Sequence, residues 1–134
     1  MTTWSGIRCA VGLLLGALPA EAHHSISGAY HGNRTVRVDG VVVRFDFVNP
    51  HAFVTLDVRA PDGAPERWRL EMDDRRELSQ IGMTEDTLKA GDRLVVSGNP
   101  SRDGGQQMYI RLLERPADGY AYEQVGSRPR LRSR

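Results

Sequence analysis

Four histidines are the residues of this sequence whose types and spacing best suit metal chemistry: His23, His24, His31 and His51. The neutral imidazole ring is the commonest metal ligand in proteins. If the mature chain begins at His23, the α-amine and the ring of that residue can chelate one ion together, since both nitrogens hold lone pairs at mild pH. A further imidazole from His51 would complete a set of three nitrogens that suits Cu(II).

The remaining two histidines extend this hypothesis without deciding it. His24 offers its backbone amide and ring as alternative ligands, and His31 lies in the same polar segment. A purely structural interpretation stays open, in which His51 donates a hydrogen bond that holds the turn at Asn49-Pro50. Two adjacent histidines and a distant third do not form a metal signature by spacing. Copper is therefore a hypothesis for a cofactor whose identity the sequence leaves unknown.

Residues 1–22 have the pattern of a secretory signal peptide. Arg8 is the only charged residue before the apolar run of residues 9–18, Pro19 ends that run, and Ala20 and Ala22 provide the small side chains that a signal peptidase accepts. The run has about half of the roughly 20 residues that a membrane helix needs. We therefore expect cleavage after Ala22, a periplasmic mature protein and no membrane span in that protein.

The rest of the chain, residues 23–134, has a length and composition that suit one domain. The single cysteine, Cys9, leaves with the predicted signal, so neither disulfides nor thiol chemistry are expected in the mature protein. Lysine and arginine number 18 against 17 acidic residues. This balance gives no electrostatic footprint for nucleic acid, and we exclude that class of partner.

Alternating apolar residues predict five strands, at about 35–48, 52–59, 66–72, 93–98 and 107–114. A short helix near 74–81 lies between the third and fourth strands, with Asp73 or Asp74 as its cap. The alternation changes parity at Asp39-Gly40, which predicts a bulge in a long, bent first strand. This order of elements is typical of an OB-fold, so we expect an all-β protein built as a small five-stranded OB-like barrel.

The predicted domain organisation follows from these elements. Residues 1–22 are the signal peptide, residues 23–34 an N-terminal arm, residues 35–115 the barrel and residues 116–134 a disordered basic tail. The residues expected to fill the core are Val54, Leu56, Trp68, Leu70, Leu94, Val96, Ile110 and Leu112.

The sequence has no recognisable catalytic constellation. It contains no G-x-S-x-G, no Walker loop, no dinucleotide fingerprint and no CxxC. The adjacent carboxylates Asp73 and Asp74 suit helix capping better than acid–base catalysis. We therefore expect an exported, non-enzymatic binding or accessory module for an unknown small ligand or periplasmic protein. The alternative is a periplasmic copper-binding protein that uses the N-terminal histidine, and a copper redox enzyme ranks third.

Several segments together resemble an exported bacterial family called domain of unknown function 6152: AHHS at the predicted cleavage point, VNPHAFVTLDV, a tryptophan-containing strand and LKAGDRLVVSGNPSRDG. The resemblance covers residues 22–115, and His23-His24-Ser25 and Asn49-Pro50-His51-Ala52 are its most specific parts. Members usually have an aromatic residue after HHS, whereas Ile26 stands there in this chain. The resemblance implies export and a small β domain, and it implies no particular activity or ligand.

Overall fold

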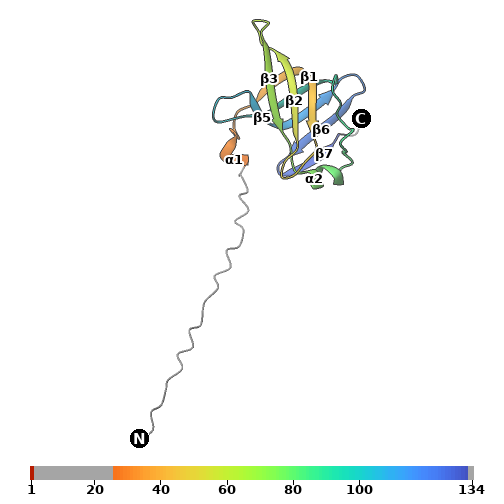
Figure 1. The fold of residues 1–134 in the computed structure, drawn as a ribbon. Helices are drawn as coiled ribbons and strands as arrows, with labels where there is room; N and C mark the ends of the chain where they lie inside the picture. The colour runs from red at the N-terminus through yellow and green to blue at the C-terminus, as the bar shows by residue number, and fades with distance from the viewer. Residues whose placement is uncertain (2–25, 133–134) are drawn as a thin grey trace.

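The structure, a computed structural model, describes Met1 and residues 26–132 of the chain. Figure 1 shows a barrel of strands, with the two short helices beside its lower half as drawn. In chain order the elements are α1 (Ile26–Ala29), β1 (Val36–Asp46), β2 (Phe53–Arg59), β3 (Pro65–Glu71), α2 (Arg75–Gln80), β4 (Arg93–Pro100), β5 (Gln107–Arg115), β6 (Tyr120–Val125) and β7 (Arg128–Leu131).

The first five strands close into a barrel. Strands β1, β2 and β3 form an antiparallel meander, β1 also pairs with β4, and β4 pairs with β5. The barrel closes where β3 and β5 run parallel, with Leu70 opposite Met108. The predicted fold class, an all-β OB-like barrel with a short helix between the third and fourth strands, is confirmed.

Apolar side chains from alternate strand positions fill the interior of the barrel. Six residues predicted to be buried are 0 % exposed: Val54, Leu56, Leu70, Leu94, Val96 and Ile110. Trp68 packs against this core but is only partly buried. Its indole nitrogen donates a hydrogen bond of 2.9 Å to Glu66, which keeps that end of the ring near the surface.

Leu112 was also expected in the core, and this prediction is wrong. Leu112 is partly exposed, and Leu113 is the fully buried residue. The reason is an irregularity in the pairing of β5 with β4, where Arg111 is an extra residue without a partner. One extra residue changes the inward parity of a strand, so the inward positions move from Ile110 to Leu113.

The predicted irregularity in the long first strand is present, but it lies at Val43, and its predicted position at Asp39-Gly40 is wrong. Inward positions continue without a break through Gly40 and Val42, and only then does the pairing with β2 shift. Gly40 serves a different purpose, because a Cβ atom there would lie 2.6 Å from the backbone oxygen of Asp57. The inward side chains after the bulge are Phe45 and Phe47, so the change of parity is real, and the missing side chain of Gly40 placed it too early in the sequence pattern.

The segment predicted as a disordered tail instead forms β6 and β7, so that prediction is wrong for residues 120–131. Strand β6 pairs with β5, and β7 pairs with β6, which extends the sheet beyond the barrel. Tyr122 is 0 % exposed and joins the core. Burial of this one aromatic ring stabilises a hairpin whose basic residues remain at the surface, and the basic residues dominated the sequence pattern.

Both helices are short, and α2 is capped by Asp74. Its carboxylate accepts a hydrogen bond of 2.8 Å from the backbone nitrogen of Glu77. The neighbouring Asp73 is not the cap and is buried, with 8 % exposure. Within the described part of the chain, no helix combines the length and the apolar character needed to cross a membrane.

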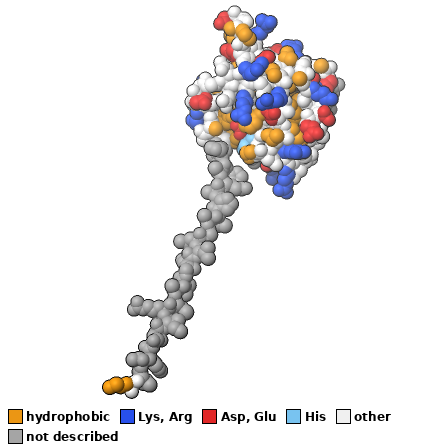
Figure 2. All heavy atoms as spheres, in the orientation of Figure 1, with side chains coloured by type: hydrophobic (Ala, Val, Ile, Leu, Met, Phe, Trp, Pro, Cys, Tyr) orange, Lys and Arg blue, Asp and Glu red, His pale blue; other side chains and the backbone are white. Residues whose placement is uncertain are grey.

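Charged side chains of both signs are interspersed over the face shown in Figure 2, without a large patch of either sign. Several of them pair across neighbouring strands. Arg93 of β4 pairs with Asp39 of β1, and Arg67 of β3 pairs with Asp57 of β2. The balance of charge seen in the composition is thus also a local balance between adjacent strands.

Candidate functional site

The described part of the N-terminal arm is docked on the barrel. Tyr30 follows α1 directly and forms an isolated β-bridge with Ser101, in the loop after β4. The amide of Arg102 donates a hydrogen bond of 2.9 Å to the carbonyl of Ala29. Tyr30 is only 4 % exposed. The arm is therefore held to the β4–β5 loop by backbone pairing and by burial of one aromatic side chain.

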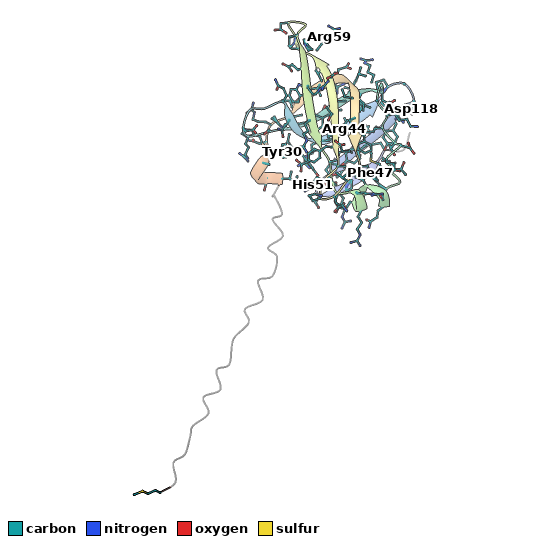
Figure 3. All side chains as sticks on the ribbon, in the orientation of Figure 1. Tyr30, Arg44, Phe47, His51, Arg59 and Asp118 are labelled. Carbon is teal, nitrogen blue, oxygen red and sulfur yellow. The ribbon has the colours of Figure 1, made fainter. Side chains whose placement is uncertain are left out.

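A groove of about 450 Å³ lies between α1, the segment that begins β2, and the β4–β5 loop. We call it the arm groove and define it by Ile26, Ala29, Tyr30, His51, Phe53 and Glu71, which all line it. Figure 3 shows Tyr30 and His51 beside α1, on the opposite side of the barrel from the tip of the β2–β3 hairpin that carries Arg59. The groove thus brings together the arm and the Asn-Pro-His segment, which lie about twenty residues apart in the chain.

His51 is oriented by its Nδ1 atom. This nitrogen lies 3.2 Å from the carbonyl oxygen of Met72 and 3.5 Å from Oε1 of Glu71. A carbonyl oxygen can only accept, so Nδ1 carries the hydrogen and donates it. In the neutral ring the lone pair is then on Nε2, and the side chain is 27 % exposed. The arrangement leaves one imidazole nitrogen able to bind a ligand or an ion.

Glu71, the last residue of β3, connects His51 to the arm. The Tyr30 hydroxyl donates a hydrogen bond to Oε2 of this carboxylate, while Oε1 faces His51. Burial raises the pKa of the Tyr30 hydroxyl, and the hydrogen bond to Glu71 and its negative charge raise that pKa further. The hydroxyl therefore stays protonated, and both oxygens of Glu71 face hydrogen-bond donors.

The floor of the arm groove also carries an aromatic surface. The guanidinium carbon of Arg69 lies 3.5 Å from the centre of the Phe53 ring, a close cation–π contact. Phe53 lines the groove beside Pro50 and His51. The groove thus presents apolar and polar groups side by side, as small-molecule sites do.

His31 lies on the arm but does not line the arm groove. Its backbone amide donates to the carbonyl of Pro100 at 2.9 Å. Desolvation lowers the pKa of the His31 ring, and the positive charges of Arg102 and Arg34 lower it further. The structure therefore places His51 in the lining of the arm groove and His31 outside it, although the sequence treats both as candidate ligands.

His23 and His24 lie outside the described residues, as does the predicted signal peptide. Ile26, which follows them closely in the chain, lines the arm groove together with His51. In residues 26–132, no group of three or more histidine, cysteine, aspartate or glutamate side chains could hold a metal ion. A metal site that uses three such side chains and includes His51 would therefore need at least one ligand from outside the described residues.

Sequence reasoning missed Tyr30 and Glu71 as site residues. Glu71 is one of several charged residues of its strand, and nothing in the local pattern marks it. Tyr30 offered a weak signal, because it is the only aromatic residue in the polar segment of residues 23–34. An aromatic residue in an otherwise polar arm indicates a point of docking.

A family model described as a family of unknown function, DUF6152, matches residues 11–109. The chain belongs to this family. The match to DUF6152 includes the docked part of the arm, β1 to β4 and the start of β5, and therefore every residue that lines the arm groove. The resemblance expected from the sequence is confirmed. No curated protein matches the chain.

Proposed function

We propose that this DUF6152 domain is an exported, non-catalytic binding module whose ligand site is the arm groove. One observation carries the proposal. The docked arm and the Asn-Pro-His segment together line a groove of about 450 Å³, and the His51 ring in this groove is held by Nδ1 and leaves Nε2 for a ligand. A volume of this size is typical of small-molecule sites, which range over roughly 300–1,000 Å³.

The chemistry of the groove favours a small organic molecule with both apolar and polar groups. Ile26 and Phe53 provide apolar contact, and Nε2 of His51 provides a hydrogen-bond acceptor in the neutral ring. Glu71 adds a carboxylate that is already held by Tyr30, so its position is fixed before a ligand arrives. The tied side chains make the site pre-organised.

Native mass spectrometry of protein purified from the periplasm tests this proposal. Ala29 lines the groove, and Ala29→Trp fills it without touching the barrel core. We expect a bound small molecule on the wild-type protein, its loss from Ala29→Trp, and its retention by Val125→Trp, which adds the same ring at an exposed position on β6. A molecule retained equally by both variants, or none on the wild-type protein, would contradict the proposal.

Copper is the second candidate ligand, and the orientation of His51 favours it. Its Nδ1 hydrogen bond to Met72 is the support that fixes the tautomer of a metal-binding histidine and leaves Nε2 for the ion. The α-amine and ring of His23 would supply the other two nitrogens if export exposes them. The docking of Ile26 at the same groove supports this arrangement.

A Cu(II) titration of protein that begins at His23 tests the copper proposal. The matched control carries one extra N-terminal residue, which removes the α-amine from the ligand set and leaves every side chain in place. We expect the extended protein to bind Cu(II) at least about tenfold more weakly, a change that corresponds to about 1.4 kcal/mol. Equal affinity of the two proteins would dismiss the N-terminal amine as a ligand.

A further inference from the structure

A second hollow, of about 320 Å³, adjoins the arm groove at Tyr30. We call it the Asp73 pocket and define it by Tyr30, Asp73, Asn99, Tyr109, Arg111 and Gln124, which line it together with Ile26 of the arm. Tyr30 and Ile26 line both hollows. The Tyr30 and Tyr109 rings lie 6.1 Å apart and form an aromatic wall.

Asp73 is a buried carboxyl group with only one of its oxygens satisfied. The Tyr109 hydroxyl donates a hydrogen bond of 2.5 Å to Oδ1. Oδ2 is buried and accepts no hydrogen bond of normal geometry among the described residues, although the Gln124 and Tyr122 side chains lie near this carboxyl. Leaving a carboxylate oxygen buried without a donor is destabilising, so native proteins rarely retain one without a reason. A ligand that donates a hydrogen bond to Oδ2 would supply the missing partner.

The surroundings of Asp73 disfavour its charge. Burial raises the pKa of this carboxyl, although the hydrogen bond from Tyr109, the nearby Gln124 side chain and the charge of His51 act in the opposite direction. A positively charged donor bound at Oδ2 would favour the ionised form. A neutral donor at the same position would stabilise the ionised carboxylate less.

Arg111 supplies the opposite charge in the same pocket. Its Nε donates to Oδ1 of Asn99 at 2.6 Å, and its Nη1 donates to the carbonyl of Gly126 at 3.0 Å. The guanidinium also lies 5.1 Å from the centre of the Tyr109 ring. Its partners are therefore an amide, a carbonyl and a ring, and no carboxylate in the described part of the chain forms an ion pair with it. The charge of Arg111 is held in place and remains available to an anion.

We propose that the Asp73 pocket binds a small zwitterion, with an ammonium group at Asp73 and a carboxylate at Arg111. The positive charge of Arg111 would repel a simple cation, and the negative charge of Asp73 would repel a simple anion. The pair of charges therefore selects against both kinds of ion. The rings of Tyr30 and Tyr109 and the side chain of Ile26 provide apolar contact. Free α-amino acids with apolar side chains have this chemistry. This site shares Tyr30 and Ile26 with the arm groove, but the proposal does not depend on the function proposed there.

Isothermal titration calorimetry with L-leucine as the probe tests the proposal. N-acetyl-L-leucine lacks the ammonium charge and L-leucine amide lacks the carboxylate, so each removes one of the two proposed contacts. We expect saturable binding of L-leucine and at least about tenfold weaker binding of each blocked analogue. No saturable binding of L-leucine, or equal binding of the three compounds, overturns the proposal.

Asp73→Asn separates a binding role from a structural one. The substitution keeps the shape and an acceptor for Tyr109 while it removes the charge. We expect at least about tenfold weaker binding of L-leucine and, without ligand, a higher thermal midpoint than that of the wild-type protein. Asp57→Asn removes a carboxylate from an exposed ion pair with Arg67, outside the lining of the pocket, and should leave L-leucine binding unchanged. Unchanged binding by Asp73→Asn, or a lower midpoint without ligand, would assign Asp73 to the fold alone.

Arg111→Gln keeps the proposal testable if Asp73→Asn does not fold. Loss of the guanidinium removes the proposed contact to the ligand carboxylate and leaves Asp73 in place. L-leucine should then bind no better than L-leucine amide, because the difference between these two probes is the carboxylate. A preference for L-leucine that survives in Arg111→Gln contradicts the assigned orientation.

Discussion

The two hollows that share Tyr30 each contain one carboxylate, Glu71 at the end of β3 and Asp73 just after it, and the hydrogen bonding of the two carboxylates differs. In the arm groove, the oxygens of Glu71 face the hydroxyl of Tyr30 and the Nδ1 atom of His51. In the Asp73 pocket, one oxygen of Asp73 bonds to Tyr109 and the other accepts no hydrogen bond of normal geometry among the described residues. Glu71, with both oxygens facing donors, holds the arm in place, whereas Asp73 has one oxygen that a ligand would bind in our proposal.

The residue between the two hollows should give the largest effect. Tyr30→Ala removes a buried ring that lines both sites, and we expect the free energy of unfolding to fall by about 3 kcal/mol, measured in urea. Tyr30→Phe is the matched control, because it removes only the hydrogen bond to Glu71 and should cost about 1–2 kcal/mol. A loss below about 1 kcal/mol for Tyr30→Ala would show that docking of the arm contributes little to the fold.

Neutralising each carboxylate should change stability in opposite directions. Glu71→Gln replaces the carboxylate that accepts the hydrogen bond of the Tyr30 hydroxyl and faces His51. We expect the free energy of unfolding to fall by about 1–2 kcal/mol. Asp73→Asn removes a buried charge of which only one oxygen accepts a hydrogen bond. We expect the free energy of unfolding to rise by about 1 kcal/mol. Urea unfolding at neutral pH measures both, and changes of the same sign would break the comparison.

Asp73 and its neighbour Asp74 have different roles, because only Asp74 caps α2. Asp74→Ala removes the bond to the backbone nitrogen of Glu77 at the start of α2, and we expect a loss of about 1 kcal/mol in urea unfolding. Because Asp74 alone acts as the cap, the effects of Asp74→Ala and Asp73→Asn should have opposite signs. A stability loss of equal size at both positions would mean that the two residues share the capping role.

The effect of Asp73→Asn should also depend on pH. Burial raises the pKa of the Asp73 carboxyl, so this group binds its proton more tightly in the folded protein than in the unfolded chain. Below about pH 4 this carboxyl is protonated in both the folded and the unfolded protein, so it does not lower the free energy of unfolding. As the pH rises through the raised pKa, its ionisation lowers the free energy of unfolding. Tyr109, Gln124, His51 and Asp74 surround this carboxyl in both proteins. Their contributions largely cancel in the difference between variant and wild type, which should grow from pH 4 to pH 7.

Much of the barrel was predictable from the sequence because strand alternation reports burial directly. The exceptions have local causes. Arg111 is an extra residue in β5 that moved the core position from Leu112 to Leu113, and Gly40 left an inward position without a side chain. Neither a bulge nor an empty inward position can be distinguished from a change of face in a single sequence.

The candidate site was predictable only in part. His51 stood out by its type and by the segment around it, and the groove it lines is shared with the arm, as a copper site would require. Tyr30 and Glu71 meet across the structure through a contact between residues far apart in the chain. Such a contact depends on the pairing of the arm with the loop after β4, which brings Tyr30 to the end of β3, and no local pattern contains that information.

The claim that His51 binds Cu(II) in the arm groove is the account's sharpest statement about this site, and copper titration of variants tests it most directly. In protein that begins at His23, we expect His51→Ala to weaken Cu(II) binding by at least about tenfold. His31→Ala should change it by less than about twofold, because His31 does not line the groove. Equal affinity of wild type, His51→Ala and a protein with an extra N-terminal residue would contradict the copper account and leave the groove to an organic ligand.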